Sequence, residues 1–154
     1  MKLQGKVAVV TGGARDIGRA VSVKLAIEGA KVVVNYFENE SEANETVKLI
    51  ENSGGEAIAV YADATNLEDI SNLVKATTAA FGAKVDVLVN VAGGLFARKT
   101  IDAVDVDFYN LLMDVNFKSA VFVTQAFKPL MGKGASVINF ASQAARDGGG
   151  PGAS

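Results

Sequence analysis

Short, continuously apolar runs that alternate with amphipathic segments constrain the fold of this chain more than any other feature. Five such runs, rich in β-branched residues, lie at 7–11, 32–34, 57–61, 87–89 and 137–140. Strands that are apolar on both faces are typical of a parallel sheet covered by helices on each side. The sequence therefore predicts an α/β fold, a doubly wound parallel sheet of the Rossmann type with right-handed crossovers.

Amphipathic segments between these runs predict the helices. The first ends at Gly29, and the others are expected near 41–52, 67–81 and 104–131. Asn66 stands at the cap position of the third, where its side chain can accept from free backbone amides. The fifth apolar run, in contrast, has no predicted partner strand after it and should form an open, apolar sheet edge that favours self-association.

The segment 104–131, predicted as one long helix, is apolar on two sides. One face carries Phe108, Leu111, Leu112, Val115, Phe122 and Val123, and the other carries Met113, Phe117, Ala120 and Val121. A helix that is apolar on two sides is buried on two sides. We expect the second face to form a subunit interface in a homo-oligomer, a dimer or tetramer; the alternative is that other parts of the same chain cover it.

Composition bounds the remaining possibilities. The length of 154 residues predicts a single domain, 1–154, and 15 basic against 17 acidic residues give no electrostatic case for nucleic acid or an anionic membrane. Cysteine and histidine are absent, which excludes disulfides, thiolate nucleophiles and Ser-His-Asp catalysis and argues against a metal site. Without a signal-like or membrane-spanning apolar run, a cytoplasmic protein is expected.

The strongest local motif is the glycine-rich turn at 11–18, Thr-Gly-Gly-Ala-Arg-Asp-Ile-Gly, between the first strand and the first helix. Glycines at such a junction let backbone amides approach a pyrophosphate, and the helix N-terminus adds partial positive charge. The plain alternative is a turn without a ligand. The motif predicts a dinucleotide site whose contacts include Gly12, Arg15, Asp16, Ile17 and Gly18.

Together with this turn, further motifs in order make the chain resemble the short-chain dehydrogenases/reductases. Thr11, Gly12 and Gly18 match the family's Thr-Gly-x-x-x-Gly-x-Gly, Asp63-Ala64 resembles its adenine-contacting pair, and Asn90-Val91-Ala92-Gly93 resembles its Asn-Asn-Ala-Gly. The resemblance implies cofactor contacts at Asp63, Ala64, Asn90, Ala92 and Gly93, and a strand-tying role for Asn90. It also implies the strand order 3-2-1-4-5.

Two positions depart from the family pattern. Asp16 replaces the middle glycine of the turn, where a carboxylate should repel a pyrophosphate; it is expected to cap the helix and face solvent. Val91 replaces the second asparagine of the later motif.

The catalytic residues implied by the resemblance are Asn116 and Ser142. Asn116 lies between apolar neighbours, which predicts a buried, hydrogen-bonded side chain, and Ser142 follows the fifth strand at the ligand-binding edge of the sheet. The family's Tyr-x-x-x-Lys pair does not occur in these 154 residues. We therefore expect a fragment, incomplete on its C-terminal side, that shows no turnover by itself.

In its activity the complete protein would resemble carbonyl reductases or alcohol dehydrogenases of this family, such as the 3-oxoacyl-acyl-carrier-protein reductases. They transfer a hydride between NAD(P) and a small carbonyl compound or secondary alcohol. A non-catalytic dinucleotide-binding or scaffold protein ending at Ser154 is the alternative. An unrelated nucleotide-binding protein would share only the glycine-rich turn.

Coenzyme choice depends on the end of the second strand. An acid there usually binds the ribose hydroxyls of NAD, but this chain has Tyr36 just beyond the predicted strand. Arg15 is suited to pair with a 2′-phosphate. NADP is therefore predicted over NAD, and Glu38 is the residue that could reverse this preference.

Overall fold

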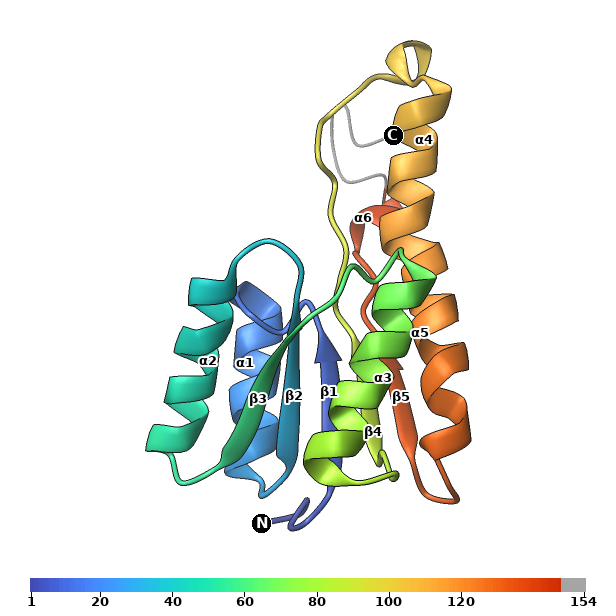
Figure 1. The fold of residues 1–154 in the computed structure, drawn as a ribbon. Coiled ribbons are helices and arrows are strands. Elements are labelled where there is room, and N and C mark those ends of the chain that lie inside the picture. The colour runs from blue at the N-terminus through green and yellow to red at the C-terminus, as the bar shows by residue number, and fades with distance from the viewer. Residues whose placement is uncertain (148–154) are drawn as a thin grey trace.

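The computed structural model describes residues 1–147 and contains a five-stranded parallel sheet (Figure 1). Its strands are β1 (Val7–Thr11), β2 (Lys31–Tyr36), β3 (Glu56–Tyr61), β4 (Val87–Asn90) and β5 (Ser136–Asn139). They lie in the order β3-β2-β1-β4-β5 and pair in parallel throughout, which confirms the predicted fold and strand order. The glycine-rich residues 148–154 lie outside the described residues.

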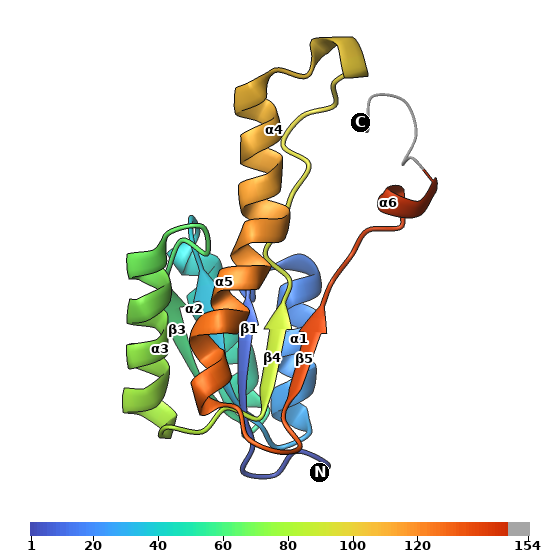
Figure 2. The same cartoon turned by 90° about the vertical axis from the view of Figure 1, so that its right-hand side faces the viewer.

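Helices cover both faces of this sheet. α1 (Asp16–Ile27) and α2 (Glu40–Asn52) lie on one face, and α3 (Leu67–Phe81) and α5 (Ser119–Phe127) lie on the other (Figures 1 and 2). The N-cap prediction for α3 is confirmed, because Asn66 Oδ1 accepts from the backbone amides of Glu68 and Asp69 at 2.8 and 3.2 Å.

The core consists of two layers, one on each side of the central strands. Ala8 and Val10 face the layer beneath α1 and α2, whereas Val7 and Val9 face the layer beneath α3 and α5. Because every residue of a central strand is buried on one side or the other, its sequence is continuously apolar.

The prediction that both faces of the fifth strand are covered is wrong for β5. Val137 and Ile138 are 41% and 45% exposed, and Phe140 just beyond the strand is 46% exposed. β5 is an edge strand that pairs only with β4 in the described sheet. Its sequence is apolar like that of a buried parallel strand, but its side chains are exposed. The prediction of an open apolar edge is confirmed.

The helix predicted at 104–131 is continuous from 106 to 127, but its hydrogen-bonding register changes in the middle. A 3-10 turn (Ile101–Ala103) precedes α4 (Val106–Met113), a π-helical segment (Asp114–Lys118) joins α4 to α5, and a second 3-10 turn (Lys128–Leu130) follows. α4 begins at Val106 because the Asp105 carboxylate caps it, accepting from the amide of Phe108 at 2.7 Å.

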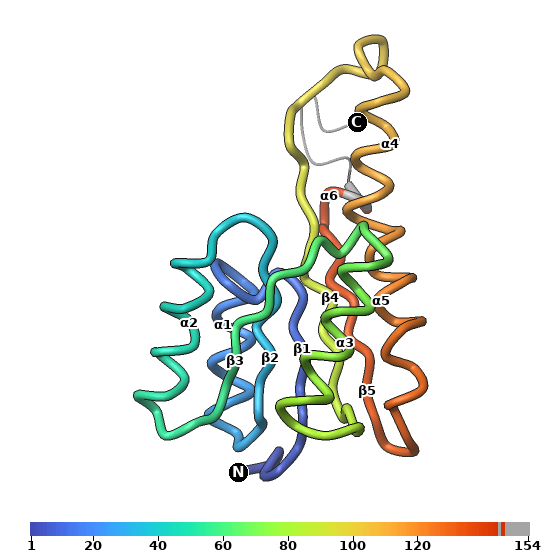
Figure 3. Tube along the Cα trace, viewed as in Figure 1, coloured from blue at the N-terminus to red at the C-terminus, as the bar shows by residue number. Residues whose placement is uncertain are grey.

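α4 projects past the carboxyl ends of the strands, as the tube in Figure 3 makes clear. The predicted second apolar face is therefore present but uncovered: Met113, Phe117 and Val121 are 40%, 61% and 44% exposed. On the predicted first face, Phe108 and Val123 are buried, whereas Leu111 is 41% exposed. A short helix, α6 (Ala144–Asp147), follows β5.

Candidate functional site

A cavity of about 620 Å³ lies at the carboxyl ends of the strands. It is lined by the β1–α1 turn, the end of β2, the segments after β3 and β4, and parts of α4 and α5. Of the predicted cofactor contacts, those that line it are Gly12, Arg15, Asp16, Ile17, Gly18, Tyr36, Asp63, Ala64, Ala92 and Gly93. The carboxyl edge of an open parallel sheet is the usual position of a ligand.

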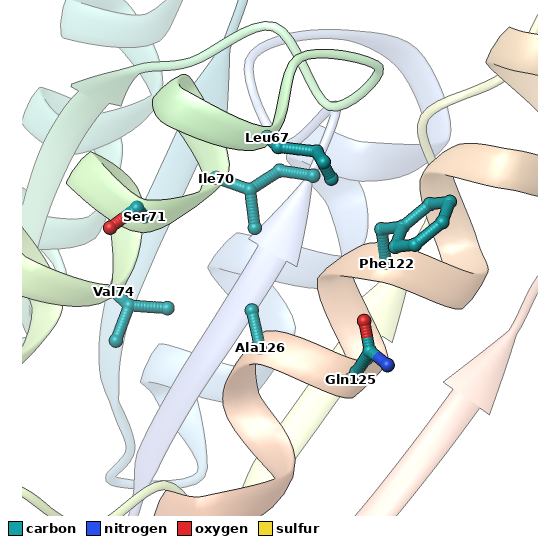
Figure 4. A pocket seen from close by; sticks show the side chains of 7 residues that line it. All are labelled: Leu67, Ile70, Ser71, Val74, Phe122, Gln125 and Ala126. Atoms are coloured by element: carbon teal, nitrogen blue, oxygen red, sulfur yellow. The ribbon is translucent and has the colours of Figure 1, made fainter.

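A smaller cavity of about 210 Å³ lies between α3 and α5 (Figure 4). Its lining comprises Leu67, Ile70, Ser71 and Val74 from α3 and Phe122, Gln125 and Ala126 from α5. These side chains carry no charge and lie on helices rather than at strand ends, so the larger cavity is the candidate site.

Two glycines allow the turn after β1 to pack closely. Gly12 has φ +60°, and a Cβ atom there would lie 3.1 Å from the backbone N and Cα of Ala92. A Cβ atom on Gly18 would overlap the carbonyl oxygen of Gly12. A larger residue at either position would push the turn away from α1 or from the segment after β4.

The buried side chain of Asn35 holds the turn from β2. Its Oδ1 accepts from the amide of Gly12 at 3.3 Å, and its Nδ2 donates to the carbonyl of Ala62 at 3.0 Å. Asn35 is only 2% exposed and also lines the cavity. Sequence reasoning missed this residue, although a lone amide at the end of an apolar strand was a usable signal.

The carbonyls of the turn are held from the opposite side, by α1 and α2. Ser22 Oγ donates to the carbonyl of Gly13 at 3.4 Å, and Thr46 Oγ1 donates to the carbonyl of Ala14 at 2.7 Å. Arg19 Nε also donates to the carbonyl of Ala14, at 3.1 Å. These contacts fix the carbonyls toward the helices and pre-organise the turn.

Asp16 does not cap α1. The N-cap residue is Arg15, no side chain caps the helix, and Asp16 is its first residue with φ +48°. Its carboxylate is 84% exposed, as expected, and lies 3.8 Å from Arg15 Nε. The cap prediction is wrong because a left-handed backbone conformation, natural for the glycine usually found there, displaces the residue from the cap position.

Thr11 joins the turn to the segment after β4. Its buried Oγ1 accepts from the backbone amides of Val91 and Ala92 at 3.1 and 3.2 Å. Since the contact uses the amide of Val91, its side chain is free to differ from asparagine, and it packs against the core beneath α1 and α2.

Asn90 ties β4 to its neighbours rather than lining the cavity. Its Nδ2 donates to Asn139 Oδ1 in β5 at 2.8 Å and to Thr124 Oγ1 in α5 at 3.1 Å. Its buried Oδ1 has no hydrogen-bond partner within the described part of the chain. The hydrogen bonds agree with the strand-tying role implied by the resemblance.

Asp63 and Ala64 lie past the end of β3 on the cavity wall. Asp63 Oδ1 accepts from the backbone amide and the hydroxyl of Thr65, both at 2.8 Å. The carboxylate thus forms a local turn while also lining the cavity.

Tyr36 is the last residue of β2, not a residue beyond it, because β2 pairs with β3 as far as Tyr36 and Tyr61. These two rings meet edge to face with centroids 5.9 Å apart, and Phe37 adds a third ring 6.1 Å from Tyr61. Burial raises the pKa of the Tyr36 hydroxyl, with smaller contributions from Glu40 and Tyr61, so it stays protonated as a donor at neutral pH.

Asn116 lies in the π-helical segment and is hydrogen-bonded but exposed. Its Oδ1 accepts from the amide of Gly94 at 2.9 Å, and its Nδ2 donates to the carbonyl of Gly94 at 2.8 Å. The absence of a side chain on Gly93 permits this approach, because a Cβ atom there would lie 2.8 Å from Asn116 Oδ1. The prediction of burial is wrong because Asn116 lies where the helix leaves the sheet.

Ser142 is exposed, and its Oγ accepts from the amide of Ala144 at 3.1 Å. Figure 2 shows the chain after β5 leading away from α4 toward α6. Neither Ser142 nor Asn116 is among the described residues that line the larger cavity, so their catalytic roles stay predictions.

The family model described as short chain dehydrogenase matches residues 6–153. The chain belongs to the short-chain dehydrogenase family. It is 42% identical over 141 residues to an uncharacterised oxidoreductase of Methylorubrum extorquens, covering 92% of this chain and 56% of that protein. It is 39% identical over 145 residues to a 3-oxoacyl-[acyl-carrier-protein] reductase of Synechocystis, covering 92% and 58%.

Solved structures of short-chain dehydrogenases extend the likeness to three dimensions. A double mutant of a Serratia marcescens enzyme superposes with a TM-score of 0.94 at 31% identity, over 99% of this chain and 62% of that one. A Burkholderia cenocepacia short chain dehydrogenase in complex with NADP gives 0.91 at 33% identity, over 99% and 61%. The NADH-dependent reductase A1-R′ complexed with NAD gives 0.90 at 34%, over 98% and 65%. The chain thus spans little more than half the length of the relatives that it matches.

No helix in residues 1–147 combines the length and the apolar character that crossing a membrane requires. The cytoplasmic location stays a prediction.

Proposed function

We propose that the chain is the coenzyme-binding part of an oxidoreductase that interconverts a small carbonyl compound and the corresponding secondary alcohol. The observation that carries the proposal is the turn after β1: Gly12 and Gly18 line the larger cavity, and the chain's own backbone packs so closely on both that neither position has space for a side chain. When bound, the nicotinamide supplies or accepts the hydride. The known oxidoreductase relatives agree with this class of reaction.

Each predicted residue has a proposed task. Amides of the turn and the N-terminus of α1 hold the pyrophosphate, with Gly12, Ile17 and Gly18 nearest to it. Asp63 and Ala64 bind the adenine, and Ala92 and Gly93 after β4 support the adjoining ribose. Asn90 supports this segment from outside the cavity by holding β4 to β5 and α5.

The proposed coenzyme is NADP, with NAD as the alternative. Arg15 lines the cavity with a side chain that is 63% exposed, and Tyr36 stands where NAD-binding relatives place an acid. Similar proteins have been solved with either coenzyme, so the comparisons do not decide between NADP and NAD. Arg15 and Tyr36 favour NADP, and Glu38, which also lines the cavity, is the residue that would favour NAD.

For catalysis we propose that Ser142 orients the substrate oxygen and that Asn116 positions a water in the proton relay. The residue that moves the proton in this family, a tyrosine followed four residues later by lysine, does not occur in residues 1–154. The 154-residue chain by itself should therefore bind coenzyme without turnover.

We also propose homo-oligomerisation through the exposed apolar face of α4 and α5, defined by Met113, Phe117 and Val121. An apolar surface of this kind is usually covered by a partner.

A matched pair of glycine substitutions tests the coenzyme site. Gly12→Ala adds a Cβ atom 3.1 Å from Ala92, whereas Gly5→Ala adds one at a similarly positive φ of +72° with nothing within 4 Å. By calorimetric titration with NADPH, Gly12→Ala should lose at least about tenfold in affinity, equivalent to about 1.4 kcal/mol, while Gly5→Ala should bind like the unmodified chain. Failure of the correctly folded, unmodified chain to bind either coenzyme would contradict the proposal.

A further inference from the structure

The charges around the larger cavity are unbalanced. Among the described residues that line it, Arg15 is the only cation, whereas Asp16, Glu38 and Asp63 contribute carboxylates. One of these, Asp16, is the immediate neighbour of Arg15, with Oδ2 3.8 Å from its Nε. The group proposed to recognise a 2′-phosphate thus already has an anion beside it.

We infer that Asp16 is a coenzyme-specificity residue, whose carboxylate competes with the 2′-phosphate of NADP for Arg15 and lowers the selectivity for NADP over NAD. The inference rests on the proposed function and assigns a role to the residue at which this chain departs from the family's turn.

Its backbone conformation indicates that Asp16 is not needed to build the helix start. With φ +48°, it occupies a conformation that glycine adopts without strain and that other residues adopt only at a cost, least for aspartate and asparagine. No side chain caps α1, so the carboxylate does not compensate by binding the free amides.

The contact with Arg15 is loose enough to be exchanged. Both side chains are largely exposed, at 63% for Arg15 and 84% for Asp16, and 3.8 Å is longer than a good charge-assisted hydrogen bond. A 2′-phosphate carries more charge than a carboxylate and offers several acceptor oxygens. It can therefore displace Asp16 from Arg15, but only at the cost of the contact between those two side chains.

Two effects of Asp16 can be separated by their dependence on the coenzyme. Repulsion between Asp16 and the pyrophosphate acts on NADPH and NADH equally, because both contain that group. Competition for Arg15 acts only on NADPH and requires the guanidinium. A double-mutant cycle across positions 15 and 16, measured with both coenzymes, isolates the second effect.

The experiment compares the dissociation constants of NADPH and NADH for the unmodified chain, Asp16→Asn, Arg15→Gln and the double variant. Asparagine tolerates the same left-handed backbone and has nearly the same shape, so Asp16→Asn removes only the charge. Asp16→Asn should tighten NADPH about three- to fivefold more than NADH, as expected for an exposed charge contact. In the Arg15→Gln background this difference should vanish.

Salt dependence and a distant control complete the test. The extra affinity for NADPH that Asp16→Asn provides should be smaller at high salt than at low salt, because exposed charges are screened. Asp102→Asn, which removes an exposed carboxylate that does not line the cavity, should leave the ratio of the two constants unchanged.

Equal tightening of both coenzymes by Asp16→Asn, or an NADPH-specific gain that survives in the Arg15→Gln background, would overturn the inference while leaving the proposed function intact. If the folded, unmodified chain binds neither coenzyme, both fail.

Discussion

The turn after β1 and the region that carries the proposed catalytic residues are built in different ways. The turn after β1 is enclosed by its own chain: Asn35, Thr46 and Arg19 reach it from three elements, and its glycines exclude side chains. The region that carries the proposed catalytic residues projects from the sheet, where Asn116 and Ser142 are exposed. The difference indicates that the proposed coenzyme site is pre-organised within the described residues, whereas these residues do not enclose the proposed catalytic side chains.

The largest expected effect is at Gly18. Gly18→Ala places a Cβ atom on the carbonyl oxygen of Gly12, an overlap with backbone that no rotamer change relieves. Such overpacking should cost about 3 kcal/mol of unfolding free energy, measured by urea denaturation, and should abolish measurable NADPH binding. Near-normal binding by a folded Gly18→Ala variant would mean that the turn is not as closely enclosed as described.

Removal of the Asn35 contacts should have the next largest effect. Asn35→Ala leaves the Gly12 amide and the buried Ala62 carbonyl without this partner, which should cost about 2 kcal/mol of stability and weaken NADPH binding. Asn35→Asp keeps the acceptor for Gly12 but loses the bond to Ala62 and places a buried carboxylate beside the cavity, so it should not restore the affinity. The exposed Asn52→Ala serves as the control and should change neither quantity.

Asp86 lies just before β4, at the opposite end of the sheet from the cavity, and serves as a comparison with the turn after β1. Burial raises its pKa, but Lys6, Lys84 and the amide of Val7 outweigh burial and lower the pKa overall. A carboxylate with a lowered folded-state pKa stabilises the fold above its unfolded pKa of about 4, and the stabilisation is lost as pH falls through the folded-state value.

Asp86→Asn should therefore cost about 1–2 kcal/mol at neutral pH and flatten the acid side of the stability profile. Since Asp86 lies far from the cavity, the affinity for NADPH should not change. Denaturation curves between neutral pH and pH 3 supply the measurement, and an unaltered acid slope would refute the assignment.

The smallest effect on stability is expected on the exposed face of α4 and α5. Phe117→Ser changes a side chain that is 61% exposed, so the unfolding free energy of the monomer should shift by less than about 0.5 kcal/mol. Self-association in sedimentation-velocity experiments should decrease. A large loss of monomer stability would show instead that this ring belongs to the chain's own core.

The sheet could be predicted well because a strand that is buried on both faces is continuously apolar, whatever its neighbours are. The runs at 7–11 and 87–89 differ from β1 and β4 by at most one residue. The π-helical segment at Asp114–Lys118 could not be predicted, because an apolar stripe along a helix does not show where the hydrogen-bonding register changes.

Within the site, the glycines and Arg15 were predicted from local chemistry, because a turn between strand and helix is a local motif. Asn35 was missed because its task depends on Gly12 and Ala62, which only the fold brings together. The exposure of Asn116 likewise depends on how far α4 extends beyond the sheet, which apolar neighbours in the sequence do not indicate.

Backbone amide shifts of residues 12–18, followed by heteronuclear NMR during titration with NADPH, test most directly whether this turn holds the coenzyme's phosphates. The account predicts large, saturable shifts of the amides of Gly12, Ile17 and Gly18 and small changes in the exposed part of α4. Saturable binding that leaves these three amides unmoved would contradict it.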